Sequence, residues 1–501
     1  MVDPGGLRMG SSAGRWVLVA TVLGSGIVMI DSTVVNVALP RIGQDLGAGF
    51  GGLQWTINAY SLTLAALILL GGSLGDHFGR RRLFLIGVIW FACASAACGL
   101  AQNIEMLVAA RALQGVGGAL LTPGSLALIS ASFRGPDRAA AIGAWSGIGG
   151  LAGAVGPFLG GFLVEWSWRA VFLINLPLAA VVVVVTLLRV PESRDTQSPP
   201  GLDVTGTILA VLGLAGLTYG LTELSNRGTT QIALTAVAVG VLALVAFAVA
   251  QRRSTHPLVP PVLFADNTFR VANVITLLIY GALGVVFLLL VLQLQTVAGF
   301  SPLMAGMALL PVTAVLLMFS SRAGVLVGRI GPRLPMTVGP LLAAAGLLLM
   351  MRIGPDASWL MDVLPAALVF GAGMAFVVAP LTSAVLDSAP DHLAGSASGV
   401  NNAVARGGGL LAVALVPGLA GISGTDYADA TTFNTGFRTA IAIAASLLLA
   451  ASALAFTGFK SRTERAAAKD RIFLEEHNHC PTAGPPLHPQ PDTTGRTGGL
   501  P

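Results

Sequence analysis

Residues 72–84 read Gly-Ser-Leu-Gly-Asp-His-Phe-Gly-Arg-Arg-Arg-Leu-Phe, a short polar turn between two long apolar runs at 54–71 and 83–101. The turn carries one acid, Asp76, and three consecutive arginines at 80–82. Its glycines allow a tight connection and close packing of the neighbouring segments. Because a basic turn between two membrane spans stays on the cytosolic side, it orients both flanking spans and, by alternation, all the others.

The composition is that of a membrane protein. Of the 501 residues, 54% are hydrophobic and only 10% are charged, and the mean hydropathy is +0.80. A soluble domain carries about 25% charged residues, so too few are present here to cover a water-exposed surface. Apolar runs of about 20 residues, the length of a membrane-spanning helix, recur along most of the chain. The predicted fold class is an all-α polytopic membrane protein.

Fourteen spans are expected. They lie near 16–39, 54–75, 83–101, 105–128, 138–164, 168–189, 203–222, 230–250, 271–295, 303–326, 334–352, 360–384, 396–421 and 437–458. The first run is too long for a cleaved signal peptide and is expected to stay as a span.

The distribution of the spans predicts six segments of chain. These are an N-terminal stub (1–15), a six-helix half (16–189), a Pro- and Ser-rich linker (190–202), two inserted helices (203–250), a second six-helix half (271–458) and a tail (459–501) rich in Pro and Gly. The tail is expected to be disordered.

Arginine and lysine are distributed unevenly over the loops, which predicts the topology. If the N-terminus is cytosolic, the outside loops hold only Arg41, Arg169, Arg227, Arg352 and Arg438, whereas most of the remaining basic residues fall in the inside segments. Cytosolic loops carry this excess, so both termini are expected in the cytosol. Arginine far outnumbers lysine, which suggests a GC-rich bacterial genome.

A faint internal repeat suggests a duplicated architecture. The sequence Gly324-Val-Leu-Val-Gly-Arg-Ile-Gly-Pro-Arg333 matches Gly72 to Arg81 in the positions of Gly, Leu, Gly and Arg, with Gly328 in place of Asp76. Secondary transporters are commonly built from such repeats and hold the substrate between them.

Other classes of site find little support. Cys93, Cys98 and Cys480 form neither a disulfide framework nor a zinc spacing. For the tail cluster of His477, His479 and Cys480, an inert tail is favoured over a metal site. The scattered basic residues do not suggest nucleic acid, and no phosphate-binding loop occurs, so an ion gradient is the expected energy source. No catalytic cluster is found, and no cofactor is expected.

Four motifs, in order along the first six spans, together carry a family resemblance. They are the turn at 72–84, Leu107-Val-Ala-Ala-Arg-Ala-Leu-Gln-Gly-Val-Gly-Gly-Ala119, Gly156-Pro-Phe-Leu-Gly-Gly161 and Asp31-Ser-Thr-Val-Val-Asn-Val-Ala-Leu-Pro40. The chain resembles the major facilitator superfamily, and within it the fourteen-helix drug:proton antiporters. The resemblance implies two six-helix halves with two extra helices between them.

Asp31 and Arg111 are the predicted proton-coupling residues. Asp31 lies about fifteen residues into the first span, near the bilayer centre, where ionisable groups are costly and usually functional. Arg111 shares a polar, small-residue face with Gln114, Gly115 and Gly118, so it is expected to point into the bundle. The alternatives are a packing hydrogen bond of Asp31 within its own helix and a purely structural salt bridge to Arg111.

The resemblance also implies roles for two glycine-containing motifs. In the family, the motif with Gly156, Pro157, Gly160 and Gly161 marks exporters; ordinary helix packing is the alternative.

In the turn, Gly72, Asp76, Gly79 and Arg80 are predicted to act in gating. Asp76 would contact the start of span thirteen near residues 394–396; the alternative is a solvated turn that only sets topology.

A substrate cavity is predicted with less support from the residues. Its candidates are Asn36, Trp55, Tyr60, Gln114, Gln293 and Arg406. Some family members have an acid in span thirteen, whereas this chain has Arg406, which suits neutral, zwitterionic or anionic substrates unless it pairs with Asp387 or Asp391.

The predicted function is efflux of a lipophilic drug or antibiotic in exchange for protons, by alternating access, from a monomer in the cell membrane. The alternative is a proton-coupled importer of a nutrient or peptide. An enzyme or a sensor is not expected.

Overall fold

The computed structural model describes residues 7–193, 203–225, 230–255, 257–390, 393–424 and 429–459. Over these ranges, fourteen helices are long and apolar enough to cross a membrane, and each coincides with a predicted span. The predicted all-α class and the number of spans are therefore confirmed. Most of the predicted linker, and the tail from 460 onward with its His and Cys cluster, lie outside the described residues.

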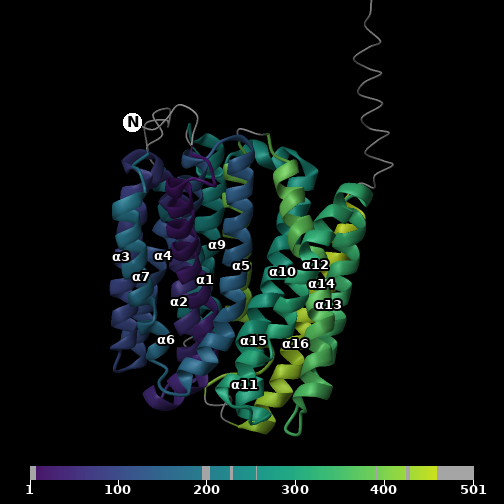
Figure 1. The fold of residues 1–501 in the computed structure, drawn as a ribbon. Helices are drawn as coiled ribbons and strands as arrows, with labels where there is room; N and C mark the ends of the chain where they lie inside the picture. The colour runs from purple at the N-terminus through teal and green to yellow at the C-terminus, as the bar shows by residue number, and fades with distance from the viewer. Residues whose placement is uncertain are drawn as a thin grey trace, which may run out of the picture. The chain divides into compact units, whose positions relative to one another are not determined.

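The helices follow one another with short connections. The first seven are α1 (Ser12–Leu46), α2 (Phe50–Phe78), α3 (Arg80–Gly99), α4 (Ile104–Ser132), α5 (Gly135–Val164), α6 (Ala170–Leu173) and α7 (Asn175–Arg189). The others are α8 (Val204–Ser225), α9 (Thr230–Arg253), η1 (Pro261–Ala265), α10 (Asn267–Leu292), η2 (Gln293–Val297), α11 (Pro302–Met307), α12 (Leu310–Ile330), α13 (Arg333–Met350), η3 (Trp359–Val363), α14 (Leu364–Asp387), α15 (Ala394–Leu419) and α16 (Ala430–Gly458). Within the described part, most of the labelled helices run side by side (Figure 1).

The polar turn at 72–84 is shorter than the sequence suggests. Residues up to Phe78 continue α2, and α3 begins at Arg80, so only Gly79 stands outside a helix. Gly79 has φ +103°, a conformation that favours glycine because no Cβ is present. The amide of Gly79 donates to the Gly75 carbonyl at 3.1 Å and closes the last turn of α2.

The repeated motif in the second half has a similar break, one residue longer. Helix α12 ends at Ile330, Gly331 has φ +81°, and α13 begins at Arg333. Gly331 occupies the position in the repeat that Gly79 occupies in the first copy. The sequence repeat therefore corresponds to a repeated helix–glycine–helix connection.

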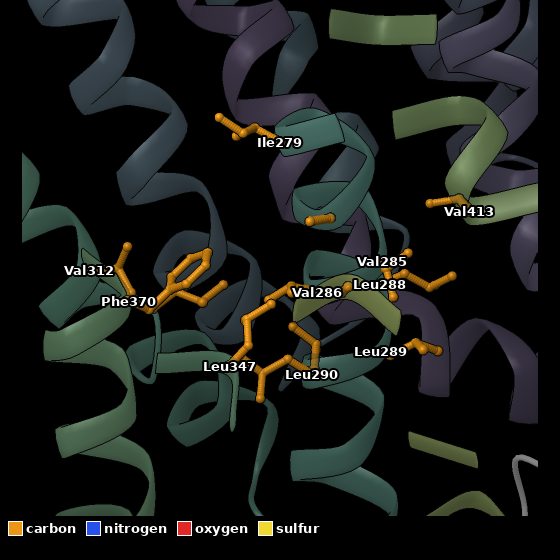
Figure 2. Packing of buried hydrophobic residues seen from close by; sticks show 14 of the residues in the cluster. Ile279, Val285, Val286, Leu288, Leu289, Leu290, Val312, Leu347, Phe370 and Val413 are labelled. Carbon is orange, nitrogen blue, oxygen red and sulfur yellow. The ribbon is translucent and has the colours of Figure 1, made fainter. Parts of the chain in front are cut away.

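The core of the second half is built around α10. Figure 2 shows apolar side chains of α10, among them Val286 and Leu290, near residues of the neighbouring helices. They belong to one buried cluster with Val312 of α12, Leu347 of α13 and Phe370 of α14. No charged group interrupts this part of the cluster, because α10 is almost wholly apolar between its two ends.

The two halves meet along α2 and α15. We call the end of the bundle where α1 finishes the Leu46 end, and the opposite end the Ser12 end. Near the Leu46 end the Gln54 amide donates to the Val413 carbonyl at 2.8 Å. Nearer the Ser12 end, Leu69 lies beside Gly399. A Cβ added to Gly399 would be 3.1 Å from the Leu69 side chain. Helices α2 and α15 therefore run antiparallel and stay close at both levels.

The two inserted helices pack on each other through glycines and reach this junction. A Cβ added to Gly216 would lie 2.9 Å from the Cα of Gly240, so α8 and α9 approach closely. Ser225 of α8 donates to the Ala414 carbonyl of α15 at 2.9 Å. Helix α8 also packs against α2, so it contacts both halves where they meet.

Candidate functional site

Asp31 lies on α1, completely buried in the interior of the first half. Among the residues that the structure describes, it is the one carboxyl found with the buried side chains. Its Oδ2 accepts from Nη1 of Arg111 at 2.6 Å. Its Oδ1 accepts from the amides of Gln114 at 2.8 Å and Asn175 at 3.0 Å. The Asp31 carboxylate on α1 therefore accepts hydrogen bonds from three donors on α4 and α7. Thr33 and Asn36 of its own helix are not the donors.

Arg111 lies on the predicted inward face of α4, and only 2% of its surface is exposed. Its Nε donates to the Thr56 carbonyl of α2 at 3.1 Å, and its Nη1 also donates to Gln114 at 2.7 Å. The centre of the guanidinium is 4.1 Å from the ring centroid of Tyr60. The close approach of α2 and α4 depends on Gly115, where a Cβ would overlap the side chain of Thr63. The face predicted from the spacing is confirmed by this burial.

Two further residues complete the network and were not singled out by the sequence. The Ser95 hydroxyl of α3 accepts from Gln114 at 3.1 Å and from Asn175 at 3.0 Å, and it donates to the Phe172 carbonyl at 2.8 Å. Asn175 is the first residue of α7 and an isolated amide in an apolar run, which was its only available signal. Ser95 lies among small residues, and its sequence context did not indicate a role in the site.

The arrangement compensates both buried charges. An ion pair removed from water is costly unless its remaining donors and acceptors are also satisfied. Here each Asp31 oxygen has at least one donor, and two of the guanidinium nitrogens of Arg111 donate hydrogen bonds. All the donors aim at the ionised carboxylate, so a proton added to Asp31 would compete directly with Arg111.

The glycines of the 156–161 motif lie at contacts of α5 with α1 and α11. A Cβ on Gly156 would overlap Thr33, and one on Gly160 would lie 2.8 Å from the Val34 carbonyl. A Cβ on Gly161 would lie 2.7 Å from the Cα of Leu303 in α11. This motif therefore permits close packing from the middle of the bundle toward the Leu46 end, across the halves as well as within the first.

Toward the Ser12 end, four glycines of α5 lie where a side chain would meet no neighbour. A Cβ added to Gly143, Gly147, Gly149 or Gly150 would meet no atom within 4 Å. We call the part of α5 with the closely packed glycines at 156–161 its tight half, and the part with the open glycine positions at 143–150 its open half.

Of the four residues predicted for gating, Gly72 and Asp76 lie in the last turns of α2, Gly79 lies between the helices, and Arg80 begins α3. Asp76 pairs with Arg80 at 2.7 Å across the break at Gly79, and this is the ion pair that Asp76 forms among the described residues. The predicted contact near 394–396 is not found for Asp76 among the interactions of the described residues. Gly72 lies near Pro123, 3.6 Å from where its Cβ would be. Glu192 accepts from the backbone amides of Arg81 and Arg82 and caps the start of α3.

The predicted cavity residues are dispersed. Gln114 and Tyr60 surround Arg111, as described above. Asn36 is 9% exposed and donates weakly to Ser32 of its own helix. Gln293 is buried in the second half and donates to Asn434 and to the Ile353 carbonyl.

Trp55 faces the inserted helices instead of Asp31. Its ring lies 6.1 Å from that of Tyr219 in α8. It also lines a pocket of about 760 Å³ formed by α2, α4 and α8, where Glu105 and Glu223 supply the acidic groups. Among the described residues, no group of three His, Cys, Asp or Glu side chains is placed to hold a metal ion.

Comparison with known proteins agrees with this arrangement. A sequence model described as the Major Facilitator Superfamily matches residues 21–413. The chain is 37% identical over 392 residues to the multidrug resistance protein Stp of Mycobacterium tuberculosis, covering 77% of this chain and 72% of the relative. It is 37% identical over 470 residues to the puromycin resistance protein pur8 of Streptomyces alboniger, covering 90% and 92%.

A third relative and two solved structures extend the comparison. The tetracenomycin C resistance and export protein of Streptomyces glaucescens is 36% identical, covering 80% of this chain and 74% of the relative. A bacterial spinster homologue in an inward-facing conformation has a TM-score of 0.64 at 19% identity, covering 92% of this chain and 99% of the other. The D-xylose–proton symporter has a TM-score of 0.64 at 15% identity, covering 90% and 96%. With fourteen apolar helices and a match over most of its length, this chain belongs to the major facilitator superfamily of membrane transporters.

Proposed function

We propose that this transporter exports a lipophilic drug or antibiotic across the bacterial cell membrane and draws its energy from inward proton flow. The observation that carries the proposal is the buried pair of Asp31 and Arg111, 2.6 Å apart. The export direction is supported by relatives that are described as resistance or export proteins. No bound cofactor enters this scheme, and a monomer suffices for it.

The proton-coupling step follows from the competition for Asp31. When Asp31 is ionised, it holds Arg111, Gln114 and Asn175 in one network. A proton on Asp31 removes the charge that Arg111 pairs with, and the helices that carry these groups, α1, α4 and α7, are free to shift. Each state of the carboxyl thereby favours a different arrangement of the first half.

Alternating access is supported by the contacts between the halves. Near the Leu46 end, Gln295 of η2 donates to the Val37 carbonyl at 3.0 Å, and the Phe50 amide donates to the Gly424 carbonyl at 2.7 Å. Toward the Ser12 end, the glycines of α5 face open space. If the basic loops lie in the cytosol, the Leu46 end is extracellular, and this arrangement is closed to the outside.

Expression in a drug-sensitive bacterium tests the proposal. The wild type should raise resistance to at least one compound of a lipophilic antibiotic panel, and Asp31→Asn should abolish the effect. The matched control is Asp45→Asn, which removes an exposed carboxylate that binds Trp168 and Arg169 at the end of α1. Equal resistance from Asp31→Asn and the wild type would contradict proton coupling through this carboxyl.

Vesicles of known orientation separate export from import. In inverted vesicles acidified inside, the active compound should accumulate, and collapse of the pH gradient with nigericin should release it. Accumulation only in right-side-out vesicles, driven by a proton gradient directed inward, would instead favour the nutrient importer.

A further inference from the structure

Arg406 on α15 is a half-buried cation, and the described residues supply no counter-charge for it. Its Nε is buried and has no hydrogen-bond partner among the described residues. No carboxylate in the described part of the chain forms an ion pair with it. Of the two acids considered from the sequence, Asp387 is exposed at the end of α14 and Asp391 lies outside the described residues. An uncompensated charge inside a protein is costly. Binding of a ligand with the opposite charge would therefore be favourable at this guanidinium.

The position of Arg406 along α15 brings it to the middle of the bundle. Helices α2 and α15 are antiparallel, with Val413 opposite Gln54 and Gly399 close to Leu69. Arg406 is halfway between 399 and 413, so it lies level with residues 61–62 of α2, next to Tyr60. A Cβ added to Gly409, three residues further along α15, would lie 3.4 Å from the Tyr280 carbonyl of α10. Arg406 therefore approaches the aromatic ring that covers Arg111, from the opposite half of the protein.

Open space lies beside Gly407, the residue that follows Arg406 in α15. Gly407 is buried, yet a Cβ added there would meet no atom within 4 Å. The next residue is different, because a Cβ on Gly408 would lie 2.6 Å from the Leu277 carbonyl. Tyr280 of α10 keeps 38% of its surface accessible. A ligand group therefore has room at Gly407, one residue along α15 from Arg406.

We propose that Arg406 binds an anionic group of the transported molecule, a carboxylate or a phenolate, with the Tyr280 hydroxyl beside it. A guanidinium suits this role because its planar set of N–H donors matches a carboxylate. The inference rests on the proposed function and narrows its substrates to lipophilic anions and zwitterions.

Binding to matched acids and esters tests the proposal without any proton gradient. The probes are rhodamine B, pyrenebutyric acid and dansylglycine, each with its methyl ester, titrated into the purified full-length protein in lipid nanodiscs at pH 7.5. The wild type should bind the acids about tenfold more tightly than the esters, the size expected for hydrogen bonds to a charged group.

Three variants identify the source of that preference. Arg406→Gln should abolish it, Arg406→Lys should keep part of it, and the control Arg322→Gln on α12 should keep all of it. Arg322 is the matched control because it is exposed and interacts with Phe319. The proposal is overturned if the wild type does not favour the acids, or if the preference survives in Arg406→Gln.

Thermal unfolding separates ligand binding from a structural role. Arg406→Gln should unfold at the same or a higher temperature than the wild type, because it removes an uncompensated charge; a clear fall would mean that Arg406 stabilises the fold and would overturn the proposal. Chloride replaced by gluconate should leave the acid preference unchanged. A preference that depends on chloride would show a resident inorganic anion and also overturn it.

The outcome is independent of the export assay. Acid-selective binding that depends on Arg406, in a protein that confers no resistance, would reject the exporter and keep the anion site. Resistance without acid-selective binding would keep the exporter and reject the anion site.

Discussion

At the scale of single residues, the first half is organised around a carboxylate and a guanidinium that neutralise each other out of contact with water. The sequence predicted Asp31 and Arg111, because an acid and an arginine inside apolar runs are rare and costly. Asn175, a partner of Asp31, was not predicted, although it donates to both Asp31 and Ser95. A single amide in an apolar run has no spacing that reveals which distant helix it meets.

Loss of one charge should cost far more than loss of both. Asp31→Asn leaves Arg111 buried without a counter-charge and should lower the free energy of unfolding by about 3–5 kcal/mol. The double variant Asp31→Asn/Arg111→Gln should recover most of this stability while transport stays absent. Thermal unfolding in detergent, together with the efflux assay, measures both effects. A double variant as unstable as the single one would show that the pair is not compensated in the way described here.

At the scale of the helix, α5 shows how one glycine-rich segment serves two purposes. The sequence of this helix contains several glycines four residues apart, a spacing that allows helices to approach closely. The structure separates them into tight positions such as Gly156 and Gly160, against α1, and open positions such as Gly147. The pattern alone could not distinguish the two groups, because the spacing is the same in both.

Two alanine substitutions in α5 should change the stability of the protein in opposite directions. Gly156→Ala places a methyl group against Thr33 and should destabilise the protein by about 1–3 kcal/mol. Gly147→Ala enters open space and should be neutral or stabilising by up to about 1 kcal/mol, since alanine favours helix. Unfolding temperatures of the two purified variants check this. Equal destabilisation by both would contradict the division of α5 into a tight half and an open half.

At the scale of the whole transporter, the two halves are held together near the Leu46 end by hydrogen bonds that cross between them. Gln295 is the clearest case, because its side-chain amide in the second half donates to the Val37 carbonyl in the first. The adjacent Thr296 donates only to Leu292 of its own half. Under the proposed alternating access, a rocking motion of the halves would have to break such contacts at one end.

Removal of the Gln295 bond should shift the balance between the two conformations. Gln295→Leu loses about 0.5–1.5 kcal/mol, enough to change the ratio of the two states about two- to tenfold. Spin labels are placed at the exposed positions Gln44 on α1 and Met307 on α11. Pulsed electron–electron double resonance should then show a larger share of long distances between the two labels. Thr296→Val is the matched control and should leave the distances unchanged. An identical distribution in both variants would exclude Gln295 as a latch.

The number of helices, a turn within residues 72–84 and the proximity of Asp31 and Arg111 could all be inferred from the chain, because apolar length, clustered glycines and charges inside apolar runs leave local marks. The role of Asn175, the two kinds of glycine in α5 and the isolation of Arg406 emerged only when distant helices were brought together. The physical reason is that a helix surrounded by lipid is apolar on every side, so its residues do not reveal which face meets which neighbour. Helix–helix contacts in this transporter are therefore set by packing between segments far apart in the chain.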